Sequence, residues 1–374
     1  MRIIFVNRYF WPDHSATSQM TADLAFHLAA RGHDVEVITS RQRYDDPAAR
    51  LAPREVERNV TITRVATTRF GRMLLAARAL DYLTFYASAW LALLVRRGIV
   101  VVMTDPPLMS VAAMFASTRR VNWIQDLFPE VAVALGVARW SGFLRAIRDL
   151  SLRTARANVV LSDAMAARVP WRAVVRQNWA DAALHPVPHD SPTFTVGYSG
   201  NLGRAHEFAT ITGAMELLAK ERNIRFVITG GGAQLTAVKQ ATASLGNVEF
   251  RPYAPREALS ESLSSADVHL VSLQPELEGL IVPSKIYGIL AVARPAIFIG
   301  SADGEIGNML TSHDCGFTVA PGDAHALASR IRELAADRAR AAAMGRRGLA
   351  LYQERFAPAI ALAHWERILS EAAR

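Results

Sequence analysis

The sequence predicts an α/β protein made of two doubly wound, Rossmann-like parallel-sheet domains. Short runs of continuous apolar residues alternate with segments in which apolar residues recur every three or four positions. Continuous apolar strands are typical of parallel sheets that helices cover on both faces. The alternation stops at residues 178–192 and then starts again, and 374 residues are enough for two domains of ordinary size.

The first half begins with a strand–helix–strand unit. Residues 2–6 predict a buried strand, and a loop at 7–18 leads into a helix in which Met20, Leu24 and Leu28 repeat before Gly32 ends it. The strands expected in this half are residues 2–6, 34–39, 99–104 and 121–126. These elements form a first domain over residues 1–180.

The segment 178–192 carries three prolines and no periodicity, which predicts an interdomain linker. A second domain then covers residues 193–355. Its expected strands are 194–198, 224–229, 248–251, 267–273, 296–299 and 317–319, and its expected helices include 207–220, 233–245 and 286–293. A last helix at 358–373 has no strand after it, so we expect it to pack back on the first domain.

Composition excludes several classes of protein. A chain with 51% hydrophobic and 20% charged residues is globular rather than disordered. Its single cysteine, Cys315, excludes an intramolecular disulfide and a cysteine-ligated zinc site. The start of the chain shows no signal-peptide pattern, and the apolar stretch at 82–95 is too short to cross a membrane. We therefore expect a cytoplasmic protein without a membrane span.

The net charge of +8 lies in the first half. Residues 1–180 hold 24 Arg against 14 acidic residues, a net +10, whereas residues 181–374 carry a net −2. This asymmetry indicates either an anionic partner, such as nucleic acid, an acidic membrane surface or a phosphorylated ligand, or simply solvated faces in an Arg-rich composition. No nucleic-acid-binding module is recognisable, so we expect no nucleic acid.

One apolar segment of that basic half is bracketed by arginines. It covers residues 73–95, and the arginines are Arg69, Arg72, Arg78, Arg96 and Arg97. The pattern fits an interfacial helix that brings Phe85, Trp90 and nearby leucines to the headgroups of an anionic membrane. A buried core helix with arginines at its ends explains the same pattern.

Ligands of open parallel sheets bind beyond the carboxyl ends of the strands. The first such loop, residues 9–18, lacks the G-x-G-x-x-G pattern, which disfavours a dinucleotide-dependent oxidoreductase. The triplet at 230–232 is explained by a tight turn or by a ligand. The loop 198–206 has glycines that allow close backbone approach, and Arg204 and His206 are placed to meet an anion.

A second loop, residues 276–285, ends in Ser284 and Lys285 before a helix. Lys285 is one of only three lysines in the chain. A capping Ser284 with a solvated Lys285 is the simplest interpretation, but it places a cation at the positive end of the helix dipole. An anionic ligand at this helix start removes that conflict.

Four segments together resemble glycosyltransferase family 4, in the branch of bacterial surface-polysaccharide enzymes that build O-antigen or capsule. They are residues 31–39 (RGHDVEVIT), 125–130 (QDLFPE), 197–206 (GYSGNLGRAH) and 282–291 (VPSKIYGILA). The resemblance runs nearly end to end and in order.

The resemblance implies a GT-B fold, with two domains facing a central cleft. It implies a retaining transferase that moves a sugar, here an amino or deoxyamino sugar, from a nucleotide diphosphate-sugar that we expect to be UDP-linked. The implied acceptor is a polyprenyl diphosphate-linked saccharide, so the enzyme would work at the anionic inner face of the cytoplasmic membrane as a peripheral protein. No cofactor and no metal is implied, and the sequence contains no Asp-x-Asp motif.

Site residues follow from the resemblance by position. The donor-binding set is Gly200, Asn201, Arg204, Arg251, Tyr253, Glu278, Gly279, Leu280, Ser284 and Lys285. The catalytic set is Asp126, Glu278 and Lys285, and the acceptor side has Asp13, His14 and Asp126. Asp126 is expected to orient the acceptor hydroxyl or accept its proton, or alternatively to cap the turn that follows it. Asp13 and His14 are weaker candidates, because a loop pair of this kind is often merely solvated.

The sequence departs from the family at two places. Many members carry two glutamates eight positions apart, but Ile286 stands eight positions after Glu278, and Gly288 stands before the Leu-Ala-Val-Ala run. The basic residues of many members correspond to Asn201 and His206, so Arg204 or Lys285 has to supply more of the charge. A non-catalytic sugar-nucleotide-binding protein and a GT-B sugar-nucleotide 2-epimerase remain the alternatives.

Overall fold

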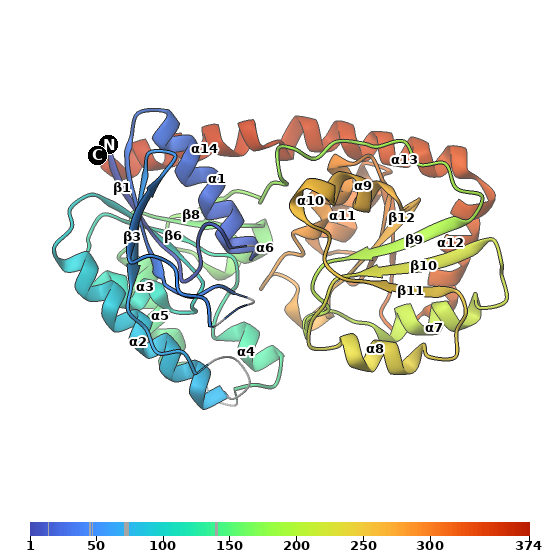
Figure 1. Ribbon diagram of the computed structural model, residues 1–374, viewed down its shortest axis with the longest axis horizontal. Helices are drawn as coiled ribbons and strands as arrows, with labels where there is room; N and C mark the ends of the chain where they lie inside the picture. Colours follow the sequence, from blue (N-terminus) through green and yellow to red (C-terminus); the bar gives the residue numbers. More distant parts are fainter. Residues whose placement is uncertain (14, 45, 47, 71–74, 139–140) are drawn as a thin grey trace. The chain divides into compact units, whose positions relative to one another are not determined.

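The computed structural model describes the whole chain except residues 14, 45, 47, 71–74 and 139–140 (Figure 1). The chain forms two compact units. The first contains Met1–Gln177 and Ala361–Arg374, and the second contains Asn178–Ile360. The segment predicted as a linker therefore belongs to the second unit.

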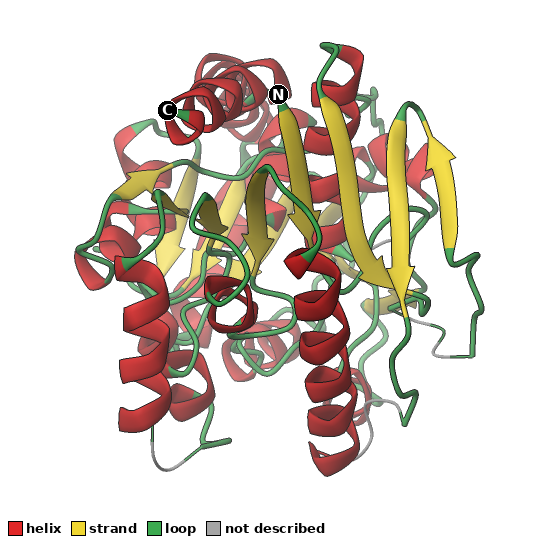
Figure 2. Cartoon of the chain, turned by 90° about the vertical axis from the view of Figure 1, so that its left-hand side faces the viewer, coloured by secondary structure: helices red, strands yellow, loops and turns green. Residues whose placement is uncertain are grey.

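The first unit is built on an eight-stranded sheet of order β3-β4-β2-β1-β5-β6-β7-β8. Its strands are β1 (Arg2–Val6), β2 (Asp34–Ser40), β3 (Arg54–Glu57), β4 (Val60–Val65), β5 (Ile99–Met103), β6 (Arg120–Trp123), β7 (Ala157–Val160) and β8 (Ala173–Val175). All neighbours pair in parallel except β3, which runs antiparallel to β4 at the edge (Figure 2). The central strands β1 and β5 are almost fully buried, as continuous apolar runs predict.

Helices cover both faces of this sheet. They are α1 (Ala16–Ala30), α2 (Leu75–Leu94), α3 (Met109–Met114), α4 (Glu130–Ala134), α5 (Gly142–Arg153), α6 (Asp163–Arg168) and the last helix, α14 (Pro358–Ala373). Figure 1 shows α1 and α14 on one face and α2, α3 and α5 on the other. Right-handed crossovers explain this, because α1 connects strands in one direction along the sheet and α2, α3 and α5 connect them in the other.

The last helix lies on the first unit, where the sequence analysis expects it. Trp365 is buried, and its ring centroid lies 4.4 Å from that of Trp123 on β6. His27 Nε2 on α1 lies 2.7 Å from Glu366 Oε1 on α14. The aromatic pair and this polar contact together hold the helix against the sheet.

Strands β7 and β8 were not predicted, and two further features of the first sheet differ from the expectation. The hairpin of β3 and β4 was not predicted, because β3 is a half-exposed edge strand with charged residues and lacks a continuous apolar run. Strand β6 ends at Trp123 rather than at residue 126. Gln125 has left the ladder, since its N–H donates to the Thr104 hydroxyl at 3.2 Å.

The second unit has a fully parallel six-stranded sheet of order β11-β10-β9-β12-β13-β14. Its strands are β9 (Phe194–Ser199), β10 (Ile224–Thr229), β11 (Val248–Arg251), β12 (Val268–Ser272), β13 (Ala296–Ile299) and β14 (Gly316–Val319). Its helices are α7 (Ala209–Leu217), α8 (Leu235–Ala241), α9 (Leu259–Ser264), α10 (Lys285–Ala291), α11 (Glu305–Ser312), α12 (Ala324–Ala336) and α13 (Arg338–Leu351). Two short 3₁₀ helices, η1 (Arg256–Ala258) and η2 (Pro275–Leu277), and a short π-helix, η3 (Tyr352–Phe356), complete the unit. Helices α7 and α8 are shorter than their periodicity predicted.

Residues 178–192 form neither helix nor strand but are attached to the second unit. The N–H of Val187 donates to the Ser264 hydroxyl at 3.0 Å, and Arg294 donates to the Val187 carbonyl at 3.2 Å. The prolines interrupt secondary structure, as expected, while hydrogen bonds to α9 and the loop after α10 keep the segment in place.

Helix α2 has one buried face and one exposed face, so each of the two interpretations that the sequence left open describes part of it. Phe85 is fully buried in the core beneath the sheet, whereas Trp90 is 36% exposed. Residues 72 and 73 lie outside the described residues. Within the part of the chain that the structure describes, no helix combines the length and apolar character needed to cross a membrane.

We predict that Trp365→Ala destabilises the first unit by about 3–5 kcal/mol, because it leaves a cavity against Trp123. Urea unfolding measures the loss. Phe143→Ala is the matched control, since Phe143 is 77% exposed and its truncation should change stability by less than about 0.5 kcal/mol. Equal unfolding midpoints for the two variants would contradict the anchoring role of α14.

Candidate functional site

Two glycine-containing loops meet at the carboxyl edge of the second sheet. Ser199 of β9 and Thr229 of β10 are paired in register, so the loops after them start at the same level. Gly200 and Gly230 have φ of +127° and +136°, and a Cβ on Gly230 would lie 2.1 Å from the Gly200 carbonyl oxygen. Leu202 N–H crosses between the loops to the Gly231 carbonyl at 2.7 Å. The triplet 230–232 thus has a structural reason to contain glycine.

Lys285, the first residue of α10, reaches this loop pair. Its Nζ donates to the Tyr198 hydroxyl at 2.5 Å and lies 3.9 Å from the centroid of that ring. The Tyr198 hydroxyl in turn donates to the Asn201 carbonyl at 3.0 Å. Among the described residues no carboxylate forms an ion pair with Lys285, and desolvation lowers the pKa of its ammonium group to about 7.

The simplest interpretation of the helix start is wrong on both counts. Ser284 makes no side-chain cap to α10. Lys285 is not a fully solvated lysine, because it is partly buried and its Nζ is hydrogen-bonded to Tyr198. The conflict between the cation and the helix dipole is therefore present in the folded protein, and a bound anion would relieve it.

His206 does not supply the positive charge that the sequence analysis expected. Its Nδ1 donates to the Ser272 carbonyl at 2.5 Å. Burial, with the neighbouring Lys285 charge as the second cause, lowers the pKa of His206 to about 3. The ring is neutral at pH 7, so Lys285 and Arg204 are the cations that this loop region offers.

Arg204 and Asn201 are exposed on the loop after β9. Within the described residues Arg204 forms no ion pair, which leaves its guanidinium available to a ligand. The Asn201 side chain lies against the neighbouring glycine turn, where a Cβ on Gly232 would approach its Oδ1 to 2.3 Å. Asn201 therefore lies close to Lys285, because the Tyr198 hydroxyl contacts both residues, and Arg204 follows three residues later on the same loop.

Arg251 and Tyr253 follow the neighbouring strand β11. Arg251 forms a bidentate ion pair with Glu249, at 2.6 and 3.0 Å, so its guanidinium is already engaged. Tyr253 is 58% exposed, and its hydroxyl donates to the Gly231 carbonyl at 3.3 Å. Of these two residues of the predicted donor set, Tyr253 is exposed to solvent and Arg251 is held by an acid.

Glu278 has a partner that the sequence analysis missed. Its Oε1 accepts the N–H of Glu305, the first residue of α11, at 3.0 Å. A Cβ on Gly304 would lie 2.5 Å from the Glu278 carboxyl carbon, so this approach requires glycine. Burial raises the pKa of Glu278, and the Glu305 N–H partly opposes that shift. The glycine before a helix start was the available signal.

The neighbours of Glu278 contribute backbone rather than side chains. Gly279 adopts φ +71° in the turn after η2, and Leu280 is buried. Gly288, at the place of the second family glutamate, faces leucines, since a Cβ there would meet Leu263 and Leu184 at 3.5 and 3.6 Å. Among the described residues, no charged side chain lies within 4 Å of that Cβ position.

Asp126 lies at the carboxyl edge of the first sheet, after β6. It is exposed to solvent on one side and lines a small cavity of about 30 Å³ together with Thr104, Asn122 and Arg148. Desolvation and the nearby Asp105 raise the pKa of Asp126 to about 6. In the described residues it makes no capping hydrogen bond to α4, whose start carries no side-chain cap. Its carboxyl group therefore remains available for proton transfer.

Asp13 is not the solvated loop residue that was one interpretation. It is buried, with Oδ1 accepting the N–H of Ser15 at 2.9 Å and Oδ2 accepting the N–H of Tyr44 at 2.5 Å. The carboxylate ties the loop after β1 to the loop after β2, which is a structural role. His14 lies outside the described residues.

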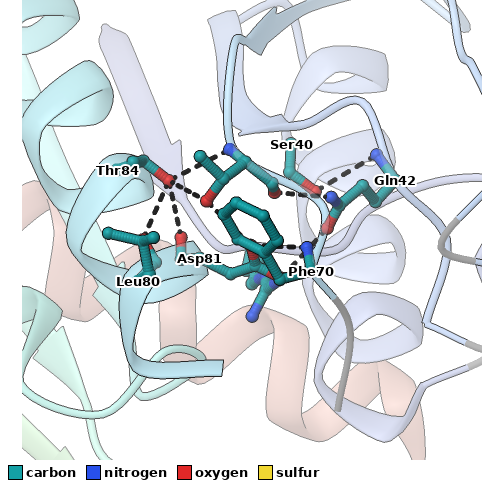
Figure 3. Close-up of polar contacts among 8 residues, drawn as sticks. Ser40, Gln42, Phe70, Leu80, Asp81 and Thr84 are labelled. Atoms are coloured by element: carbon teal, nitrogen blue, oxygen red, sulfur yellow. Dashed lines mark hydrogen bonds and ion pairs between the residues drawn. The ribbon is translucent and has the colours of Figure 1, made fainter. Parts of the chain in front are cut away.

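A buried ion pair that sequence reasoning missed organises the same edge of the first unit. Arg8, directly after β1, donates to Asp81 of α2 at 3.4 Å and to Gln42 at 3.0 Å. Asp81 Oδ1 also accepts the Thr68 hydroxyl at 2.7 Å and the Phe70 N–H at 3.0 Å (Figure 3). The signal was the one acidic residue of a mostly apolar helix.

Comparisons with known proteins agree with this architecture. Residues 193–337 match the family described as glycosyl transferases group 1, and residues 15–180 match the glycosyl transferase 4-like domain. The chain belongs to the glycosyltransferase family that these two descriptions define. It is 29% identical to the probable glycosyltransferase WbjE of Pseudomonas aeruginosa, over 71% of this chain and 73% of that protein. It is 25% identical to the putative colanic acid biosynthesis glycosyl transferase WcaI of Escherichia coli strain K12, over 89% and 92% of the two chains.

Solved structures show the same fold at low sequence identity. The sucrose-phosphate synthase of Thermosynechococcus elongatus aligns with a TM-score of 0.77 at 17% identity, covering 98% of both chains. Anabaena HepE in complex with UDP-glucose aligns with a TM-score of 0.71 at 15% identity, covering 99% of both. WaaG, a glycosyltransferase of lipopolysaccharide biosynthesis, aligns at 0.71 and 14%, covering 98% of this chain and 99% of WaaG. The predicted GT-B fold is confirmed.

We predict that Lys285→Met stabilises the protein at neutral pH and that the gain disappears as the pH rises. The unfolded lysine has a pKa near 10.4. The folded group titrates at about 7, so the cost of desolvating the ammonium is complete below pH 7. Between pH 7 and about 10 the unfolded state binds more protons, so the wild type gains stability relative to the variant.

Thermal unfolding of both proteins from pH 6 to 10 tests this. Lys239→Met is the control, because Lys239 is exposed and its Nζ lies 5.4 Å from the Phe250 ring without enclosure. A difference in melting temperature between wild type and Lys285→Met that stays constant over this pH range would show that Lys285 is not desolvated.

Proposed function

We propose that this glycosyltransferase moves a sugar, with retention of anomeric configuration and without a metal ion, from a UDP-linked donor to a lipid-linked saccharide during surface-polysaccharide synthesis. The observation that carries the proposal is the cation Lys285, which stands without an acidic partner among the described residues, beside a loop built for close backbone approach. An amino sugar is the transferred group that the family resemblance favours.

The donor diphosphate would bind at the carboxyl edge of the second sheet. Gly200 in the loop after β9 lets a ligand approach the backbone closely, and Lys285 and the exposed Arg204 offer positive charge. Tyr253 presents an exposed ring to a base. A UDP moiety is supported by HepE, a protein of the same fold whose structure is known with UDP-glucose. Glu278, which binds the α11 start through Oε1, has Oε2 left to meet a sugar hydroxyl.

Departure of the nucleotide concentrates negative charge on the diphosphate oxygens. A cation that is already in place stabilises this charge more in the transition state than in the ground state. An anion beside Lys285 also raises the pKa of its ammonium group from about 7, so binding of the diphosphate favours the charged form at neutral pH. Retention, which the family resemblance implies, fits an attack on the same face of the sugar, in which the leaving phosphate accepts the acceptor proton.

Asp126 would orient the acceptor hydroxyl or, in place of the leaving phosphate, accept its proton. With a pKa of about 6 it is mostly ionised at pH 7 and still close enough to neutrality to exchange a proton. A lipid-linked saccharide at the inner membrane face is the acceptor supported by the relatives, one of which is named for colanic acid biosynthesis. Asp13 has no part in this scheme, since its carboxylate is bound by backbone N–H groups.

We expect Lys285→Ala to lower the rate of transfer by roughly 10²–10³-fold, as loss of other charge-stabilising donors does. Arg204→Ala should act more mildly and mainly weaken nucleotide binding. Both are measured with the UDP-sugar that most raises the melting temperature of the wild type, by following UDP release and the glycosylated product. Lys239→Ala is the control. Near-normal turnover by Lys285→Ala, or an epimerised nucleotide sugar as the product, would refute the proposed role.

We expect transfer to continue in EDTA. The sequence has no Asp-x-Asp motif, and the described residues contain no cluster of three or more His, Cys, Asp or Glu side chains placed to hold a metal ion. Neutralisation of the diphosphate then falls to Lys285 and Arg204. The measurement is transfer after EDTA treatment, with and without added Mn²⁺ or Mg²⁺. Loss of activity that either ion restores would contradict the proposal.

A further inference from the structure

The outer face of α2 is apolar along its described length. Its exposed residues recur at helical spacing, and none of them is charged or polar: they are Ala76, Ala79, Leu80, Leu83, Ala87, Trp90, Leu91 and Leu94. Leu83 is 60% and Leu91 is 58% exposed. Single exposed leucines are ordinary, but a continuous apolar stripe on a helix of 20 residues, about 30 Å long, marks an interaction surface.

The opposite face of α2 is fixed, so the helix cannot turn its apolar stripe inward. Phe85, Ala89 and Leu93 belong to the buried core beneath the sheet. Near the start of α2, Asp81 is bound by Arg8, by the Thr68 hydroxyl and by the Phe70 N–H (Figure 3). Rotating the helix would break this buried ion pair and expose its charges, which costs several kcal/mol.

The charges around the stripe are basic. Helices α2, α3 and α5 lie on one face of the sheet (Figure 1) and contain only two acidic residues, Asp81 and Asp149. Asp81 is bound by Arg8 and Asp149 by Arg148, so neither is available to a partner. Arg97 and Arg119 are exposed near the end of α2 and after α3, and Arg78 lies near the start of α2. An apolar stripe with arginines at both ends is complementary to an anionic lipid surface.

The direction of α2 links this surface to the acceptor edge. The helix follows β4, so it starts at the carboxyl edge of the parallel strands, where Asp126 also lies, and runs back along the sheet. A bilayer in contact with the stripe would therefore lie beside that edge. A lipid-linked acceptor could then reach the edge without leaving its membrane.

We propose that the outer face of α2 docks on an anionic phospholipid bilayer, with the leucines and Trp90 at the headgroup boundary and the flanking arginines on the lipid phosphates. The helix lies in the interface and does not span it. This inference rests on the proposed function for the identity of the acceptor, but the surface itself is independent of the donor site. Phe85, which the interfacial interpretation of the sequence placed at the headgroups, is buried in the core and takes no part.

Sedimentation of the full chain with vesicles of phosphatidylcholine, with and without phosphatidylglycerol, at low and high salt, tests the proposal. The wild type should bind the anionic vesicles, more tightly at low salt. The double variant Leu83→Ser/Leu91→Ser should lower partitioning roughly tenfold or more at either salt concentration, because it removes apolar area that is already exposed in the free protein. The double variant Arg97→Ala/Arg119→Ala should weaken binding chiefly at low salt.

Leu217→Ser is the matched control, since Leu217 is an exposed helical leucine of the second unit, and it should bind vesicles like the wild type. Quenching of Trp90 by brominated lipid, absent in Trp90→Phe, provides a second readout that needs no change to the stripe's leucines. A wild type that ignores anionic vesicles, or a leucine variant that binds as the wild type does, overturns the proposal. So does a dimer in solution that Leu83→Ser/Leu91→Ser converts to monomers, since the stripe would then be a contact between copies of this chain.

The thermal shift caused by UDP is measured on the same samples. It reports the second unit and should be equal in wild type and in all these variants. A UDP response without vesicle binding would support the proposed function and contradict this inference. Vesicle binding without a UDP response would support this inference and contradict the proposed function.

Discussion

The carboxyl edge of the second sheet depends on the close approach of two loops, those that follow β9 and β10. Because Ser199 and Thr229 are in register, both loops start at the same level of the sheet. The Gly200 carbonyl oxygen then lies where the Cβ of any other residue at position 230 would have to be. This contact holds the loop after β9 close to the end of the sheet, where Gly200 lies next to the end of the Lys285 side chain. A Cβ on Gly200 would lie 3.6 Å from Cε and Nζ of Lys285. The donor site that we propose is built around this contact.

Lys285 carries the energetic cost of that arrangement. An ammonium group at the positive end of a helix, desolvated and without an acidic partner among the described residues, destabilises the unliganded protein. Tyr198 offsets part of this through its hydroxyl and its ring, and His206 avoids a second charge by staying neutral. Such a cluster is expected where a protein is organised to receive an anion, since the ligand removes the unfavourable interactions that the free protein retains.

The first unit uses its buried polar contacts differently. Arg8, Asp81 and Gln42 connect the loops after β1 and β2 to α2, and Asp13 connects the same two loops through backbone N–H groups. These contacts hold the carboxyl edge without any ligand. Asp126, at the same edge, is exposed to solvent and has a raised pKa. The same ion pair fixes the orientation of α2, which leaves its outer stripe exposed.

The sequence by itself determined what depends on local pattern. The bounds of β1, β10, β11 and α14 follow from apolar runs and helical spacing, and the loops carrying Gly200, Glu278 and Lys285 follow from the rule that parallel sheets bind ligands at their carboxyl ends. Only the tertiary structure decided the charge and availability of individual groups. His206 is neutral, Asp13 is bound by backbone N–H groups, Arg251 is paired with Glu249, and Glu278 caps α11. Most of these outcomes depend on burial and on partners distant in the chain, which a linear pattern does not contain. The same holds for α2, whose periodicity was compatible with a core helix and with an interfacial one. Only the packing showed that one face of α2 is buried in the core and the other is exposed.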